Sequence, residues 1–132
     1  MHELIYFSKA LFEPTNDDIQ EMLIQFREFN TAHNITGMLL YDGIHFSQMI
    51  EGDKQDITNL YSRIQKDPRH KVLTISSTRP VERRRFTKWA MVYRRIDRPM
   101  TIDLPNIDNP DVNRIEHLLA FIEKYYEIEA VG

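Results

Sequence analysis

The sequence predicts one α+β domain followed by a C-terminal helix, and three observations support this prediction. The chain has 132 residues, of which 42% are apolar and 28% charged, the balance of a globular domain. Apolar residues recur at helical spacing in some segments and form short continuous or alternating runs in others. Breaker residues separate these segments. The resulting order is β-α-β-β-α-β-β, with a third helix at the end.

The chain opens with a strand and a helix. Residues 3–8 are rich in aromatic and branched side chains, which predicts a buried strand. Thr15 is a suitable helix N-cap, and the helix is expected to run to about Thr31. Its apolar stripe consists of Ile19, Met22, Leu23, Phe26 and Phe29.

A hairpin and a second helix are expected next. Residues 35–41 and 44–50 are apolar runs separated by Asp42-Gly43, a strong signal for a two-residue hairpin turn. Residues 56–66 have helical spacing. The inward side of this helix is expected to carry Ile57, Leu60, Tyr61 and Ile64.

Two further strands, residues 72–77 and 86–93, complete the pattern. This order is ferredoxin-like with one extra strand, so we expect a five-stranded mixed sheet with both helices on one face. After a loop over residues 99–110, residues 111–128 carry an apolar stripe that predicts an amphipathic helix. That helix either caps the open face of the sheet or pairs with another chain. Its stripe is expected to be Val112, Ile115, Leu119, Ile122 and Tyr126.

Composition excludes several classes of protein. The net charge is -3, and there is no cysteine, so disulfides, thiolate zinc sites and cysteine nucleophiles are excluded and a cytoplasmic location is favoured. The five histidines show no metal-ligand spacing. No apolar run approaches the roughly 20 residues of a membrane span. The first residues also lack the features of a signal peptide.

Charge is concentrated in residues 79–98, which hold eight basic residues against two acidic ones. Such a segment could bind a phosphate group or an acidic partner. It could equally be a solvated strand edge, where basic residues discourage unwanted pairing. The sequence leaves both alternatives open.

Three uncharged polar residues fall at positions that patterning places inside. Asn30 continues the apolar stripe of the first helix, Gln48 alternates with Phe46 and Ile50, and Tyr6 lies in the first strand. A buried polar group without a partner costs roughly 1–3 kcal/mol. These groups therefore either satisfy one another or line a pocket for a flat ligand with polar edges.

Six segments together resemble the BLUF family, the sensors of blue light using flavin. The resemblance covers about residues 1–95, in the order and spacing of the family. It implies a flavin, FAD or alternatively FMN or riboflavin, bound non-covalently between the two helices. The segments are residues 4–10 (LIYFSKA), 27–30 (REFN), 35–41 (ITGMLLY), 46–52 (FSQMIEG), 67–70 (DPRH) and 85–91 (RFTKWAM).

The resemblance also implies roles for individual residues. Tyr6 matches the photoactive tyrosine, which gives an electron and a proton to the excited flavin. Gln48 matches the switching glutamine, which binds the flavin by bridging the tyrosine and the flavin's N5 and O4 edge. Both residues are thus implied to contact the flavin. Asn30 matches the anchor of the flavin's pyrimidine edge. Trp89 and Met91 match residues whose surroundings change after light. Further positions that match the lining of the flavin site are Arg27, Arg63, Asp67, Arg69 and His70.

The expected function is therefore that of a blue-light photoreceptor without enzymatic activity. Residues 1–98 would bind the flavin, and residues 99–132 would form a linker and helix that pass the signal to an unidentified protein. We expect a homo-oligomer, a dimer or larger, formed through the C-terminal helix or the open sheet face. A small enzyme, an RNA-binding module and a pigment-free interaction module are the alternatives. The sequence lacks the catalytic, metal and RNA-binding motifs that the first two require.

Overall fold

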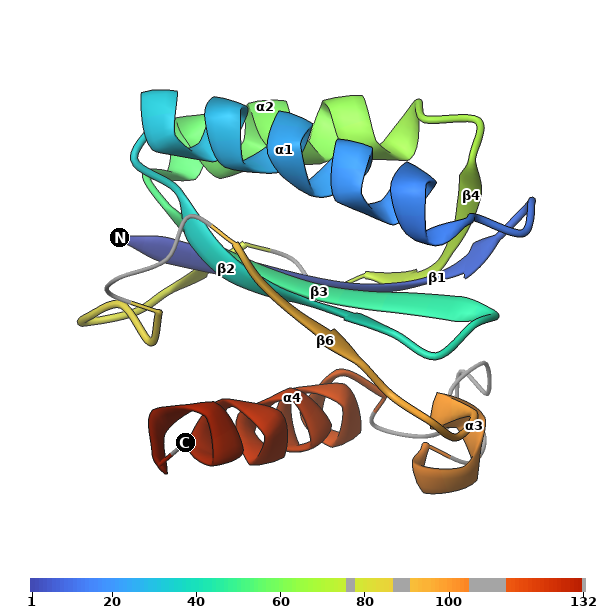
Figure 1. The fold of residues 1–132 in the computed structure, drawn as a ribbon. Helices are drawn as coiled ribbons and strands as arrows, with labels where there is room; N and C mark the ends of the chain where they lie inside the picture. Colours follow the sequence, from blue (N-terminus) through green and yellow to red (C-terminus); the bar gives the residue numbers. More distant parts are fainter. Residues whose placement is uncertain (76–77, 87–90, 105–113, 132) are drawn as a thin grey trace.

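The computed structural model describes residues 1–75, 78–86, 91–104 and 114–131 (Figure 1). Strands and helices follow one another along most of the chain. The strands are β1 (His2–Ala10), β2 (Thr36–Tyr41), β3 (His45–Gly52), β4 (His70–Ile75), β5 (Arg79–Pro80) and β6 (Val92–Arg95). The helices are α1 (Asn16–Ala32), α2 (Lys54–Gln65), α3 (Met100–Asp103) and α4 (Arg114–Val131).

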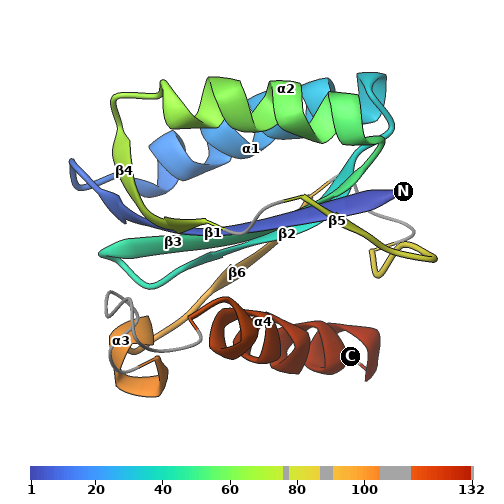
Figure 2. The same ribbon diagram turned by 180° about the vertical axis from the view of Figure 1, so that it is seen from behind.

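A mixed sheet forms the middle layer. Its order is β4-β1-β3-β2-β6, the short β5 pairs with β1, and only β2 and β6 run parallel. The two long helices α1 and α2 cover one face, and α4 covers the other (Figures 1 and 2). The structure confirms the α+β prediction, including the helical cap, and adds β5. The sheet face that was expected to be open is therefore covered within this chain.

Strand alternation divides the core into two parts. Tyr6, Phe46 and Ile50 point toward α1 and α2 and pack with the apolar stripes of both helices. Ile5 and Met49 point toward α4 instead. On that side they pack in one cluster with three side chains of α4, namely Leu118, Phe121 and Ile122.

The helix cap and the hairpin turn predicted in the first half of the chain are both present. The Thr15 hydroxyl accepts a hydrogen bond from the Asp18 amide at 3.1 Å, and the Asp18 carboxylate accepts one from the Thr15 amide, which forms a capping box. Gly43 has φ +97° in the hairpin turn, a conformation that favours glycine. The return strand begins at His45, one residue later than expected.

The second half departs from the prediction. Of the strand expected over residues 86–93, residues 87–90 lie outside the described part of the chain; β6 covers Val92–Arg95, and Phe86 and Met91 lie outside it. Both are nevertheless 1% and 2% exposed, so burial explains their apolar character without strand pairing. The loop expected over residues 99–110 contains the short helix α3.

The stripe predicted for the last helix is also partly wrong. Leu118, Phe121 and Ile122 are buried, and Leu119 is half-buried, so the buried side includes two residues that the prediction left out. Positions three and four apart share a helix face, and Leu118 with Phe121 and Ile122 satisfies that spacing as well. The predicted side chains of Val112, Ile115 and Tyr126 lie outside the described part.

Candidate functional site

A pocket of about 150 Å³ opens between α1 and α2 on the sheet. Five predicted site residues line it: Tyr6, Arg63, Asp67, Arg69 and His70. The other lining residues were not predicted as site residues, and most belong to the apolar stripes of the two helices. They are Met22, Gln25, Phe26, Phe29, Leu39, Phe46, Leu60 and Ile64.

Tyr6 and Gln48 meet because β1 and β3 pair in a register that places them directly opposite each other. The Tyr6 hydroxyl donates to Gln48 Oε1 at 2.5 Å, and Gln48 Nε2 donates to the Met91 sulfur at 3.4 Å. The Gln48 side chain therefore accepts at one end and donates at the other. Tyr6, Gln48 and Met91 form a buried chain of hydrogen bonds, which we call the Tyr–Gln–Met chain.

The Tyr6 phenol is held in its neutral form. Burial raises the pKa of Tyr6 well above the ordinary value of a phenol, and the neighbouring Tyr61 and Asp67 act in the same direction. Its ring centroid lies 6.2 Å from that of Tyr61 and 5.9 Å from that of His70. A neutral phenol keeps its proton and remains a hydrogen-bond donor to Gln48.

His70 closes one side of the pocket through both ring nitrogens. Its Nε2 lies 2.7 Å from the Ile64 carbonyl oxygen, and its Nδ1 lies 2.7 Å from the Ser8 hydroxyl. Because a carbonyl only accepts, Nε2 carries a proton and donates to Ile64, and Nδ1 pairs with the Ser8 hydroxyl. These bonds fix the ring between α2 and β1.

Asp67 and Arg69 form a bidentate ion pair just after the end of α2. Arg69 Nη2 donates to Asp67 Oδ2 at 2.5 Å, and Arg69 Nε donates to Oδ1 at 2.9 Å. These hydrogen bonds hold the pKa of the Asp67 carboxyl below its usual range. The Asp67 carboxylate thus fixes the position of the Arg69 guanidinium at the pocket wall.

The remaining predicted residues lie around this pocket rather than along its wall. Arg27 Nε donates to the Met91 carbonyl oxygen at 3.3 Å, and Asn30 and Gln48 are 0% and 1% exposed. In the described part of the chain none of these three lines the pocket. Trp89 lies outside the described residues.

Arg63 and Phe29 meet across the two helices at the pocket. The Arg63 guanidinium carbon lies 4.4 Å from the centre of the Phe29 ring, a cation–π contact. Phe29 was assigned to the core by its spacing, and that spacing did put it on the inner side of α1. The sequence held no signal that separates a core stripe from a stripe that lines a pocket.

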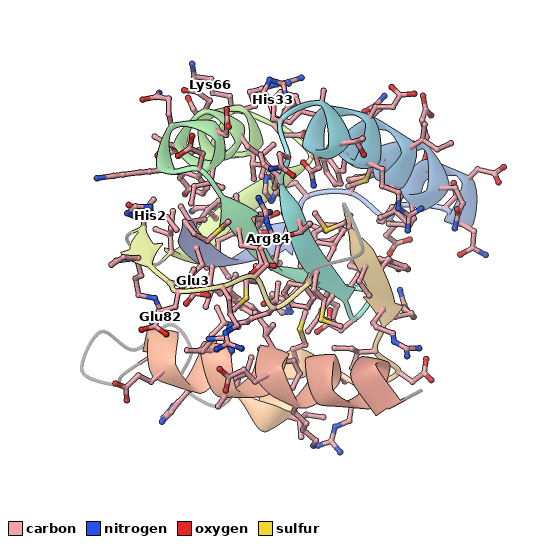
Figure 3. The ribbon with its side chains drawn as sticks, turned by 90° about the vertical axis from the view of Figure 1, so that its left-hand side faces the viewer. His2, Glu3, His33, Lys66, Glu82 and Arg84 are labelled. Atoms are coloured by element: carbon pink, nitrogen blue, oxygen red, sulfur yellow. The ribbon has the colours of Figure 1, made fainter. Side chains whose placement is uncertain are left out.

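The basic segment follows neither of the two alternatives at three of its positions. Arg79 and Arg85 form ion pairs with Glu3, and Arg84 donates to main-chain carbonyls and to Thr36. Figure 3 shows Glu3 and Arg84 at one end of the sheet. These arginines therefore face acidic and polar groups of the protein itself.

The described residues contain neither a cluster of metal-ligating side chains nor a membrane-spanning helix. No group of three histidine, aspartate or glutamate side chains there is arranged to hold a metal ion. Likewise, none of the described helices combines the length and the apolar character needed to cross a membrane.

The fold and the pocket define a small α+β domain with a pocket between two helices and a buried pair of neutral polar side chains, Tyr6 and Gln48, of which Tyr6 lines the pocket. The family model "Sensors of blue-light using FAD" (BLUF) matches residues 1–92. The chain therefore belongs to the BLUF family, and the resemblance noted in its sequence is confirmed.

Relatives and solved structures agree with this assignment. The structure described as "BlrB - a BLUF protein, dark state structure" is 28% identical with a TM-score of 0.77, and the match covers 96% of this chain and 95% of that one. BlsA in its photo-activated state is 26% identical with a TM-score of 0.71 and covers 96% and 95%. The likeness to both includes the C-terminal helix.

Larger relatives share only the sensor. The photoactivated adenylate cyclase subunit beta of Euglena gracilis is 33% identical over 89 residues, which is 67% of this chain and 10% of that protein. The blue light- and temperature-regulated antirepressor BluF of Escherichia coli is 36% identical over 67 residues, 51% of this chain and 17% of the relative. The chain thus spans between a tenth and a fifth of their length.

The domain is a blue-light sensor that uses a flavin, and it is a sensor rather than a catalyst. The pocket suits a flavin in two respects. Its aromatic and aliphatic walls match a flat ring, and Arg63 and Arg69 match a phosphate-bearing tail. The expectation of FAD agrees with the family description, and one neighbour, BlrP1 of Klebsiella pneumoniae, was solved with FMN.

Proposed function

We propose that light reorders the hydrogen bonds of Gln48 and that this change alters how α4 docks, and with it the binding of a protein partner. The observation that carries the proposal is the Tyr–Gln–Met chain. It joins the pocket wall at Tyr6 to Met91, one residue before β6. A rearrangement at Gln48 therefore reaches the segment that leads to the C-terminal helices.

Several residues would hold the flavin. Tyr6, Arg63, Asp67, Arg69 and His70 would contact it along the pocket wall, while Asn30 and Arg27 would support it from α1. A bound flavin supplies the absorption of blue light and, once excited, a site that accepts an electron. Tyr6 would give up an electron and its hydroxyl proton, which already points at Gln48 Oε1.

Gln48 is suited to switching because its amide has an acceptor end and a donor end of nearly the same shape. Turning the amide would place Nε2 beside the Tyr6 hydroxyl oxygen and Oε1 beside Met91. A thioether sulfur only accepts hydrogen bonds. The bond to Met91 would therefore be lost. Met91 accepts a hydrogen bond in one orientation of the amide and in the other it does not. We propose that the surroundings of Trp89 change together with those of Met91.

The proposal is tested by the absorption spectrum of the purified protein. We expect a yellow protein whose flavin absorption shifts to longer wavelength under blue light and returns in the dark. Tyr6→Phe keeps the packing but removes the hydroxyl, and we expect this variant to bind flavin and to lose the light-induced shift. A colourless protein that takes up no added flavin, or a normal shift in Tyr6→Phe, would contradict the proposal.

The output and the assembly are also proposals. We propose that residues 1–98 sense light and residues 99–132 transmit the signal, and that the chain forms a homo-oligomer, a dimer or larger. The sheet face is already covered by α4, so the outer surface of α4 is the contact that remains for this assembly. Light scattering on a sizing column tests the oligomer. A reducing cytoplasm suits the cysteine-free chain and is the location we propose.

A further inference from the structure

Three polar side chains stand in a row on the side of the sheet that faces α4. Thr36 on β2, Glu51 on β3 and Glu3 on β1 lie opposite one another in the strand register. Glu51 and Glu3 are 0% and 3% exposed. We call these three residues the polar row. Two buried carboxylates side by side require charged or hydrogen-bonding partners.

The chain just before β6 supplies those partners from its main chain. Glu51 Oε1 accepts hydrogen bonds from the Thr36 hydroxyl at 2.8 Å and the Phe86 amide at 2.7 Å, and Oε2 accepts one from the Arg85 amide at 2.9 Å. Arg84 adds bonds to Thr36 Oγ at 2.9 Å and to the Asn34 carbonyl at 2.6 Å. The backbone at Arg85 and Phe86 is therefore fixed to β3.

The Arg85 side chain joins two more elements. Its Nε donates to Glu3 Oε2 at 3.3 Å, and its Nη1 donates to Glu123 Oε1 of α4 at 2.6 Å. In the described part of the chain this is the ion pair that reaches α4. Leu118, Phe121 and Ile122 of α4 also pack in an apolar cluster with the sheet, and apolar packing is non-directional. Arg85 thus holds α4 in one place along the sheet.

We propose that Arg85 is the positioning residue that couples β1 and β3 to the docking of α4. The proposal rests on the proposed function, in which Tyr6 on β1 and Gln48 on β3 respond to light. The Arg85 main chain and the Glu3 contact are anchored on buried carboxylates. The Glu123 side chain is 38% exposed, so water competes for its bond to Arg85 more than for the bonds at the buried carboxylates. A shift of β1 or β3 therefore releases α4 at Glu123 first.

Hydrogen exchange of the α4 amides in the dark and in the light tests the coupling in the full chain. We expect light to speed exchange in wild-type α4. In Arg85→Gln, exchange in the dark should already be about two- to fivefold faster, and the further increase in light should fall by at least half. The flavin's red shift should be unchanged, because Arg85 does not line the pocket.

Arg79→Gln is the matched control. Arg79 pairs with the same carboxylate, Glu3, at 2.7 Å, but no described contact of Arg79 reaches α4. The Arg79→Gln variant should show the wild-type difference in α4 amide exchange between dark and light. Arg85→Lys keeps the charge and should recover most of the difference that Arg85→Gln loses.

The possible results separate the two proposals. A normal red shift with equal α4 exchange in dark and light overturns the coupling and the proposed change in α4 docking, but leaves the light-driven change at Gln48 standing. An Arg85→Gln variant with the full wild-type difference overturns it as well, and so does an Arg79→Gln variant that loses as much as Arg85→Gln. A wild-type protein without any red shift overturns the proposed function and the coupling with it.

Discussion

The two faces of the sheet bury polar side chains of opposite kinds. Toward α1 and α2 the buried groups are the neutral Tyr6, Gln48 and Asn30, beside a pocket. Toward α4 they include the carboxylates of Glu3 and Glu51, surrounded by arginines and amides. Asn30 lies on α1, but Tyr6 and Glu3 share β1, and Gln48 and Glu51 are three residues apart on β3.

In the proposed mechanism this difference explains why the neutral side chains can exchange hydrogen bonds while the carboxylates keep their partners. A neutral amide exchanges donor and acceptor at little electrostatic cost, because its two orientations are similar in shape and carry no net charge. A buried carboxylate that loses its donors leaves an uncompensated charge, which is strongly destabilising. We therefore expect loss of a buried carboxylate on the α4 face to lower stability most, and changes at the neutral groups on the α1 and α2 face to alter the flavin's red shift.

Glu51→Ala should have the largest effect on stability. It leaves the Thr36 hydroxyl and the Arg85 and Phe86 amides without their acceptor, and we expect a loss of about 3 kcal/mol in the free energy of unfolding. Urea unfolding monitored by circular dichroism measures it. The exposed Glu82→Ala is the control, with a change within about 0.5 kcal/mol. A loss below 1 kcal/mol for Glu51→Ala would show that the α4 face is not fixed by this carboxylate.

Met91→Leu should have a smaller effect, on kinetics. It removes the sulfur that accepts from Gln48 Nε2 in the dark arrangement but keeps a similar volume. Because that weak bond favours the dark arrangement by about 0.5–1 kcal/mol, recovery after light should slow about two- to fivefold. The decay of the red-shifted absorption measures this rate. Met49→Leu, a buried methionine on the α4 face, is the control, and equal slowing in both variants would contradict the role of Met91.

Raising the pH should have the smallest effect. Burial raises the pKa of Tyr6, so the neutral phenol stabilises the folded state fully below its unfolded pKa of about 10, and this contribution is lost as the pH rises above that value. Up to pH 10 the amplitude of the light-induced shift should stay constant. Difference spectra at increasing pH measure it, and an amplitude that halves near pH 10 would mean that Tyr6 titrates like an exposed phenol.

The sequence could predict which face a residue occupies but not which residues meet. Period-two alternation placed Gln48 inside, and helical spacing placed Asn30 inside. The register of β1 against β3, which brings Tyr6 to Gln48, is a long-range property. Patterning left mutual hydrogen bonds and a pocket lining as alternatives, and the family resemblance implied the link between Tyr6 and Gln48.

The sequence could not predict the partners of the basic segment either, because these partners are also distant in the sequence. Arg79 pairs with Glu3, 76 positions away, and Arg85 pairs with Glu123, 38 positions away. Local charge counts carry no information about such distant partners. Glu51 shows the same limit, since its burial depends on amides 34 and 35 positions later in the chain.

The light-minus-dark absorption spectrum of Gln48→Ala tests the central claim most directly. Gln48 does not line the described pocket wall, so the variant should still bind flavin, and wild type measured under the same illumination is the control. Without the amide there are no two hydrogen-bonded arrangements to exchange, and we predict no lasting red shift. A normal, reversible red shift in Gln48→Ala would contradict the account.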